Sequence, residues 1–301
     1  MSEYPLITNA IPLFRSKRFV DVIIANIEAI EYPNTEIIIS DRHQYDDAID
    51  ILAAYFEKDP RVTILKAKDE LSFAGHCNLL LFKGHGKYFR WMPHDDSYPR
   101  CCLMEKVKIL EAHPEIVLVN GPWHVLDVNE NVAVVRHPMK SRLGRWSYET
   151  SLFIAFGDYE AHAFKGLFRR DIPVQKGIFL FDTPRIISPE RCWEFAMSLT
   201  GEFNCYPDFA YHKHYYQEST HAGWRQAWRP MDILFNWYYK FRYQWKLDRK
   251  PGRIIVFLLF MAPLTFYQIL CDKTSGVLHK VIHAFPGKVI KRWIRVGLAR
   301  L

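Results

Sequence analysis

Along the first 120 residues, short continuous apolar runs alternate with segments in which apolar residues recur at helical spacing. Short apolar runs typical of buried strands occupy residues 5–13, 36–41, 61–65, 88–91 and 115–120. Between these runs, apolar residues recur every three or four positions, which predicts helices over about 18–30, 46–56, 74–83 and 100–112. Strands that alternate with helices at this spacing predict an α/β fold, a doubly wound sheet with helices on its faces.

Carboxylates stand at or just after the ends of two predicted strands. Asp41 ends the run EIIISD, and Asp95 and Asp96 follow the aromatic run YFRW. Ligands of doubly wound sheets bind beyond the carboxyl ends of the strands, where paired carboxylates suit a divalent cation. The alternatives are a surface turn for the Asp pair and a helix N-cap for Asp41. Because all three carboxylates lie at the carboxyl ends of predicted strands, a binding site is favoured over these alternatives.

Charge is distributed unevenly along the 301 residues. Residues 221–301 contain 15 Lys and Arg against 3 Asp and Glu, whereas residues 1–220 contain 25 against 30. We therefore predict a globular body, residues 1–229, and a basic, helical extension, residues 230–301, that has an anionic partner. The six cysteines lack CxxC spacing, which predicts reduced thiols, and the amino terminus lacks the pattern of a signal peptide.

The extension combines aromatic, basic and apolar segments. Residues 231–247 predict an interfacial helix with Leu234, Trp237, Phe241 and Trp245 on one face. Residues 254–270 carry no charge and are at the short limit for a membrane span. Because both flanks of this run are basic, we expect peripheral or monotopic attachment to the anionic cytoplasmic face of a membrane. A single span and a buried core helix are the alternatives, and the apolar character argues against nucleic acid as the partner.

Four motifs then indicate a family. NAIPLFRSKRF resembles the first strand and donor loop of the family 2 glycosyltransferases, and EYPNTEIIISD resembles their base-binding segment. AGHCNLLLFKGHGKYFRWMPHDD resembles the approach to their acidic metal motif, in the subgroup that reads HDD, and PERCWEFAMSLTGEF resembles their base-bearing helix. The resemblance covers about the first 220 residues. It implies the GT-A fold, with a mixed, mostly parallel sheet, a nucleotide-sugar half (about 1–120) and an acceptor half (about 121–229).

The resemblance also implies roles for individual residues. Asp96, with Asp95 and His94, is expected to hold Mn²⁺ or Mg²⁺, although His94 could instead orient a ligating carboxylate. Glu190 is expected to be the general base, and Asp182 is the rival candidate for that role. Alternatively, Glu190 is only a solvated glutamate in the first turn of a helix. The remaining donor contacts are expected from Pro12, Phe14, Asp41, Asn78, Asp95, Lys213 and His214.

Two motifs depart from the family pattern. Pro93 stands where the family usually has a further Asp, and Pro189–Glu190 stands where it usually has Glu–Asp. No GxGxxG or GxxxxGK[ST] motif occurs, so carboxylates and a metal would have to hold the nucleotide.

The expected activity is metal-dependent, inverting transfer of a hexose from a nucleotide-diphosphate sugar, with a UDP-sugar favoured. The expected acceptor is lipid-linked or a glycan at a membrane, as in polysaccharide or glycolipid synthesis. The alternatives are a noncatalytic, membrane-peripheral protein that binds sugar nucleotides, and a nucleotidyltransferase with a GT-A-like fold.

Overall fold

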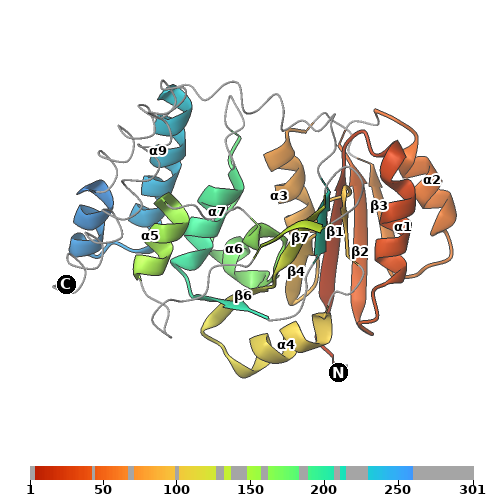
Figure 1. Ribbon diagram of the computed structural model, residues 1–301, viewed down its shortest axis with the longest axis horizontal. Coiled ribbons are helices and arrows are strands. Elements are labelled where there is room, and N and C mark those ends of the chain that lie inside the picture. Colours follow the sequence, from red (N-terminus) through yellow and green to blue (C-terminus); the bar gives the residue numbers. More distant parts are fainter. Residues whose placement is uncertain are drawn as a thin grey trace.

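The computed structural model describes residues 4–42, 45–66, 71–98, 102–126, 132–136, 148–156, 162–182, 189–206, 211–214 and 230–259. Within these residues the strands form a seven-stranded sheet of order β10-β6-β9-β4-β1-β2-β3 and a four-stranded sheet of order β5-β11-β7-β8. Figure 1 shows α1 and α2 on one side of β1 and β2, with α3 on the other side. The predicted α/β fold is confirmed.

The large sheet is mixed and mostly parallel. β1 pairs in parallel with both β2 and β4, so the strand order reverses at β1. β9 runs antiparallel to β4 and to β6. The strands of this sheet are β1 (Ile7–Leu13), β2 (Thr35–Asp41), β3 (Val62–Lys66), β4 (Tyr88–Trp91), β6 (Ile116–Asn120), β9 (Leu167–Arg169) and β10 (Glu202–Cys205). The small sheet contains β5 (Asp96–Ser97), β7 (Trp123–Leu126), β8 (Val132–Arg136) and β11 (Tyr211–His214).

The predicted helices are present with shifted ends. The first one begins as a 3₁₀ turn, η1 (Lys17–Phe19), and a second such turn, η2 (Ala163–Lys165), precedes β9. The chain is also helical over residues 251–259. The α-helices are α1 (Val20–Glu28), α2 (Ala48–Tyr55), α3 (Phe73–Lys83), α4 (Leu103–Ala112), α5 (Tyr148–Phe156), α6 (Asp171–Lys176), α7 (Pro189–Ser198) and α9 (Pro230–Leu247).

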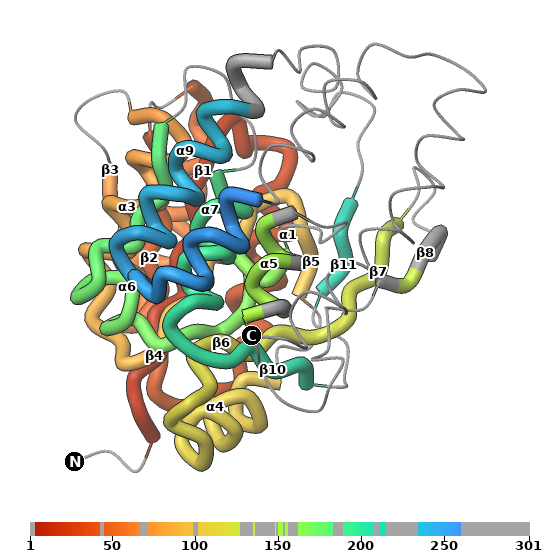
Figure 2. Tube along the Cα trace, turned by 90° about the vertical axis from the view of Figure 1, so that its left-hand side faces the viewer, coloured from red at the N-terminus to blue at the C-terminus, as the bar shows by residue number. Residues whose placement is uncertain are grey.

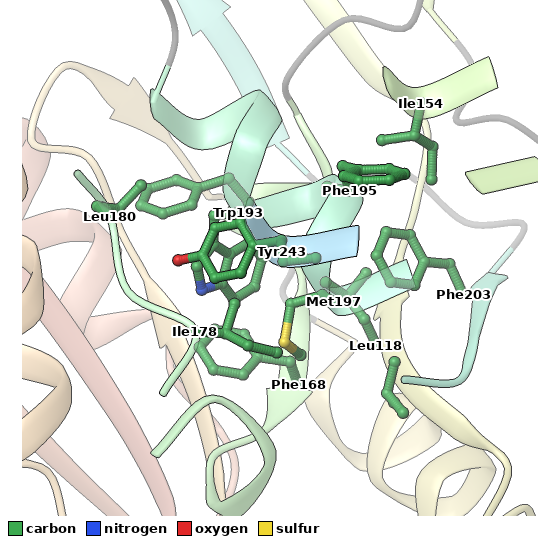
Figure 3. Close-up of a cluster of buried hydrophobic side chains, with 14 of the residues drawn as sticks. Leu118, Ile154, Phe168, Ile178, Leu180, Trp193, Phe195, Met197, Phe203 and Tyr243 are labelled. Carbon is green, nitrogen blue, oxygen red and sulfur yellow. The ribbon is translucent and has the colours of Figure 1, made fainter. Parts of the chain in front are cut away.

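Alternate strand residues supply two hydrophobic clusters, one on each face of the large sheet. In β2, Ile37 and Ile39 join one cluster and Ile38 joins the other, because successive strand side chains point to opposite faces. Helices α1, α2 and α4 contribute to the cluster with Ile37, and α3, α5, α7 and α9 contribute to the cluster with Ile38. Figure 3 shows part of the second cluster, to which Trp193 of α7 and Tyr243 of α9 both belong.

The first part of the basic extension therefore shares a core with the body. Trp237 is only 2% exposed, and its ring meets Phe257 edge-on at 6.0 Å between ring centres. The expected exposed position of Trp237 is wrong, because α7 and the 251–259 helix cover that edge of α9. Leu234 and Trp245 of the predicted face are exposed, together with Tyr238. The division at residue 229 stays a prediction.

Most of the apolar run 254–270, and the segment 277–296, lie outside the described residues. Among the residues that are described, no helix combines the length and the hydropathy that a membrane crossing requires. Figures 1 and 2 both place α9 and the following helix side by side, and Figure 1 shows them at the end of the molecule opposite α2.

Candidate active site

The acidic pair lies where the chain passes from the large sheet to the small one. β4 ends at Trp91, and Asp96 begins β5, so residues 92–95 connect the two sheets. The predicted strand over residues 88–91 is β4, and Asp95 lies four residues after its end instead of directly on it. In β5, Asp96 pairs with Lys213 of β11, which brings a distant lysine to the pair.

Asn26 of α1 fixes the backbone of this segment. Its amide nitrogen donates to the carbonyl oxygen of Asp96 at 2.8 Å, and its amide oxygen accepts from the backbone nitrogen of Tyr98 at 2.7 Å. Asn26 is itself 5% exposed. The two hydrogen bonds hold Asp96 at the start of β5.

Two lysines neutralise the carboxylates. Lys213 Nζ lies 3.2 Å from Oδ2 of Asp95 and 3.1 Å from Oδ1 of Asp96. Lys165, the last residue of η2, forms an ion pair with Oδ2 of Asp96. The side chain of Asp96 is fully buried, whereas that of Asp95 is 25% exposed. Two negative and two positive charges thus form a compact cluster, as burial of charges requires.

The cluster changes the pKa values of its members. Burial raises the pKa of Asp95, but Lys213, His94 and Lys165 together outweigh burial and lower that pKa below its usual value. Burial lowers the pKa of Lys213, and Asp96 and Asp95 outweigh it and raise that pKa. Asp95 and Lys213 are therefore charged at neutral pH.

Lys165 owes its position to the contact between η2 and α7. Glu194 Oε1 accepts a hydrogen bond of 2.8 Å from the backbone nitrogen of Phe164, and the Phe164 ring stacks on Trp91 at 4.1 Å. Gly166 allows the close approach to β6, because a Cβ there would lie 2.9 Å from the carbonyl oxygen of Val119. The turn that carries Lys165 is therefore held by its contacts with α7, with Trp91 and with β6.

Glu190 lies in the first turn of α7, one helical turn before Glu194. Its side chain is half-buried, and burial raises its pKa, although Lys165 acts in the opposite direction. Lys165 thus acts electrostatically on Glu190 while it pairs with Asp96, so its charge influences both α7 and the acidic pair. A carboxylate with a raised pKa is suited to accept a proton near neutral pH. The rival, Asp182, is exposed.

The loop after β1 borders the site through His94. Nδ1 of His94 hydrogen bonds with Oγ of Ser16 and lies 3.4 Å from the backbone nitrogen of Phe14. Burial lowers the pKa of His94, which favours the neutral ring. This nitrogen is therefore directed toward the donor loop, and the expected roles of His94 as a metal ligand or as a residue that orients a ligating carboxylate stay predictions.

The other expected donor residues lie around this loop or near it. Pro12 and Asp41 lie at the carboxyl ends of β1 and β2, one register position apart. The Arg42 guanidinium lies 4.0 Å from the centre of the Phe14 ring. His214 Nε2 hydrogen bonds with Ser97 Oγ at 3.1 Å.

The side chain of Asn78 hydrogen bonds with the backbone of Leu180, in the segment before Asp182. Its amide nitrogen donates to the carbonyl oxygen of Leu180 at 2.8 Å, and its amide oxygen accepts from the nitrogen of Leu180 at 2.9 Å. Asn78 thereby ties α3 to the segment that leads to Asp182. Its expected role as a direct donor contact stays a prediction.

Three residues of the site escaped the sequence analysis: Asn26, Lys165 and Glu194. Asn26 and Glu194 interrupt the apolar faces of their helices, between Ile23 and Ile27 and between Trp193 and Phe195. A polar residue on a buried face is a signal that could have been noticed. No pattern in the sequence around Lys165 indicates its ion pair.

The acidic pair meets part of the requirements of a divalent metal site. Among the described residues, no group of three or more His, Cys, Asp and Glu side chains converges on one position. Asp95 and Asp96 do converge on one cation, the ammonium of Lys213. The ammonium shows where a cation fits, and carboxylate oxygens are the ligands that Mg²⁺ and Mn²⁺ prefer. The pair therefore fits a divalent ion that takes further oxygen ligands from a bound diphosphate.

Known proteins resemble this chain in sequence and in fold. An uncharacterized glycosyltransferase of Haemophilus influenzae is 28% identical over 126 residues, which are 42% of this chain and 39% of that protein. Residues 1–349 of S. aureus TarS, solved with UDP-GlcNAc, superpose with a TM-score of 0.64 at 13% identity, over 84% of this chain and 71% of that chain.

A mannosyltransferase of Pyrobaculum calidifontis, PcManGT, solved with GDP-Man and Mn²⁺, has a TM-score of 0.56 at 15% identity, over 98% of this chain and 83% of that chain. At these identities the two structures share the fold with this chain. The family model described as glycosyl transferase family 2 matches residues 10–172, more than half of the chain. The protein therefore belongs to glycosyl transferase family 2 and has the GT-A fold.

Proposed function

We propose that this protein transfers a hexose from a nucleotide-diphosphate sugar to a hydroxyl group of a lipid-linked or glycan acceptor, with inversion at the anomeric carbon. The observation that carries the proposal is the position of Lys165. It pairs with Asp96 and acts on Glu190, so it links a site for a diphosphate to a carboxylate of raised pKa. Since TarS was solved with UDP-GlcNAc, a UDP-sugar is the favoured donor.

The donor side of the reaction uses the carboxyl ends of β1, β2 and β4. Pro12, Phe14 and Asp41 would contact the nucleoside, and Asp95 and Asp96 would hold Mn²⁺ or Mg²⁺. This ion, when bound, supplies a Lewis acid for the leaving diphosphate. Lys213 would add positive charge where negative charge develops.

The acceptor side depends on Glu190. Its carboxylate accepts the proton of the acceptor hydroxyl while that oxygen forms a bond to the anomeric carbon. The bond from this carbon to the nucleotide diphosphate breaks in the same displacement, so the configuration inverts. The raised pKa of Glu190 suits this proton transfer.

The membrane is the proposed location of the acceptor. The outward face of α9 exposes Leu234, Tyr238 and Trp245 together with Arg242. Aromatic and basic side chains on one face are typical of helices in the interface of anionic membranes. We infer that residues 230–301 attach the protein to the cytoplasmic leaflet in a peripheral or monotopic manner.

Nucleotide release tests the transfer reaction. The full chain is incubated with MnCl₂ and UDP-, GDP- or dTDP-sugars, with or without a membrane lipid extract, and the released nucleotide is measured. We expect release with one donor class, increased by the extract, and its loss in Asp96→Ala. Donor binding without release would favour the noncatalytic alternative. Pyrophosphate release from a nucleoside triphosphate and a sugar phosphate would favour the nucleotidyltransferase.

A further inference from the structure

The ammonium of Lys213 occupies the position that a divalent cation would take. It is the group that touches both members of the acidic pair, at 3.2 Å from Asp95 and 3.1 Å from Asp96. Lys165 differs, because it forms its ion pair with Asp96. The two lysine side chains are similarly buried, since that of Lys213 is 8% exposed and that of Lys165 is 10% exposed.

The charge balance of the site constrains what can bind. The two carboxylates and two ammonium groups cancel, so a divalent ion added alone would leave an excess of two positive charges in a buried site. A nucleotide diphosphate carries negative charge that restores the balance. It also offers an anionic partner to a displaced ammonium group.

From this geometry we propose that Lys213 is a built-in counterion that competes with the divalent metal for the position between Asp95 and Asp96. The metal takes this position only when a nucleotide diphosphate accepts Lys213 as its counterion. Metal and nucleotide therefore bind cooperatively, and each binds weakly alone. The proposal rests on the metal site of the proposed function and adds the coupling between metal binding and nucleotide binding.

Binding of Mn²⁺ tests the competition without an activity measurement. Free Mn²⁺ is measured by its electron paramagnetic resonance signal during titration of the full chain with MnCl₂, with and without UDP. In the wild type we expect UDP to tighten Mn²⁺ binding at least tenfold, within the usual range of coupling between sites. In Lys213→Met we expect Mn²⁺ alone to bind at least tenfold more tightly than it binds to the wild type.

Lys165→Met is the matched control, since it removes the same charge from a side chain of similar burial. If only net charge matters, Lys165→Met and Lys213→Met tighten Mn²⁺ binding equally, and the proposal is overturned. It is also overturned if Mn²⁺ alone binds the wild type as tightly as it does with UDP. Nucleotide release by the wild type in either case would leave the proposed function standing.

Thermal unfolding followed by circular dichroism covers the risk that Lys213→Met does not fold. Without Lys213, Asp95 and Asp96 repel each other, so the variant is expected to unfold at a lower temperature in EDTA and to regain stability with MnCl₂. A variant that stays unfolded in MnCl₂ would show that the ion cannot replace the ammonium group, which also contradicts the proposal. Lys213→Gln, which keeps a polar donor, is the second variant for the same titration.

Discussion

At the scale of single residues, Glu190 and Asp182 differ in their surroundings. Glu190 is half-buried and lies within the electrostatic influence of Lys165, whereas Asp182 is exposed. A positioned general base contributes about 10²–10⁴-fold to a rate. We therefore expect Glu190→Gln to lower kcat for nucleotide release by that factor and Asp182→Asn to change it less than about threefold, as measured with saturating donor. The reverse ranking would make Asp182 the base.

If Glu190 is the general base, kcat/KM should depend on pH in a defined way. Burial raises the pKa of Glu190 above the usual 4.5, and a general base acts when ionised, so kcat/KM should fall as the pH drops below this raised pKa. Lys165 opposes the shift, so Lys165→Met should move the acid limb to still higher pH. An unmoved acid limb in Lys165→Met would contradict the electrostatic link between Lys165 and Glu190.

Asn26 gives a second prediction at this scale. Asn26→Ala removes the hydrogen bonds to Asp96 and Tyr98 and leaves their buried backbone groups unsatisfied, which costs about 1–3 kcal/mol per group. We expect urea unfolding to show a loss of about 2 kcal/mol or more and UDP binding to weaken. Asn26→Asp, which keeps only the acceptor for Tyr98, should weaken UDP binding too. Unchanged UDP affinity in both variants would show that the two hydrogen bonds of Asn26 do not position Asp96 for the donor.

At the scale of elements, Glu194 anchors η2 to α7 and makes stability depend on pH. Burial raises its pKa well above 4.5, so the native state keeps a proton that the unfolded chain releases. This contribution to stability is fully present below the unfolded pKa and is lost as the pH rises through the folded pKa. Gln resembles the protonated acid, so the unfolding free energy of the wild type should fall relative to Glu194→Gln between pH 5 and pH 8.

Urea unfolding at the two pH values measures this difference. The wild type should lose up to about 1.4 kcal/mol per pH unit relative to the variant over the affected range. The exposed Glu57 supplies the control, because Glu57→Gln should follow the wild type at both values. Parallel curves for the wild type and Glu194→Gln would mean that Glu194 is ionised in the native state.

The elements themselves were largely predictable from hydrophobic period. Ile37, Ile38 and Ile39 are buried on alternate faces of a central strand, and such a run permits few other structures. The path from β4 into β5 was not predictable, since it depends on the pairing of Asp96 with Lys213, more than 100 residues later. Local pattern cannot show a contact of that separation.

The site was predictable in part for the same reason. Asp95, Asp96 and Lys213 came from motifs, and the structure brings them together. Lys165 was missed because its ion pair depends on the packing of Phe164 against Trp91 and on a hydrogen bond to Glu194. These contacts are tertiary. The roles of all these residues in donor binding remain predictions that the experiments above test.

At the scale of the whole molecule, the outward face of α9 and of the helix over 251–259 forms one apolar end. It exposes Leu234, Tyr238 and Trp245 of α9 and then Ile255, Leu258 and Leu259. Arg242 of α9 is exposed at helical spacing from Tyr238 and Trp245, and Arg249 is exposed two residues after α9 ends. Figure 1 shows that this end lies opposite α2. Basic side chains near an anionic lipid surface contribute about 1 kcal/mol each, and the exposed aromatic rings add apolar burial.

We therefore expect the full chain to sediment with vesicles of phosphatidylcholine and phosphatidylglycerol and to remain largely in solution with phosphatidylcholine alone. The double variant Tyr238→Ser and Trp245→Ser should bind the anionic vesicles at least tenfold more weakly, because it removes two exposed aromatic rings from this apolar end. Tyr55→Ser, an exposed aromatic of α2 at the other end of the molecule, should bind like the wild type. If the double variant binds as the wild type does, α9 does not face the membrane. If the double variant instead abolishes a dimer seen in sedimentation equilibrium without vesicles, this face joins two copies of the chain.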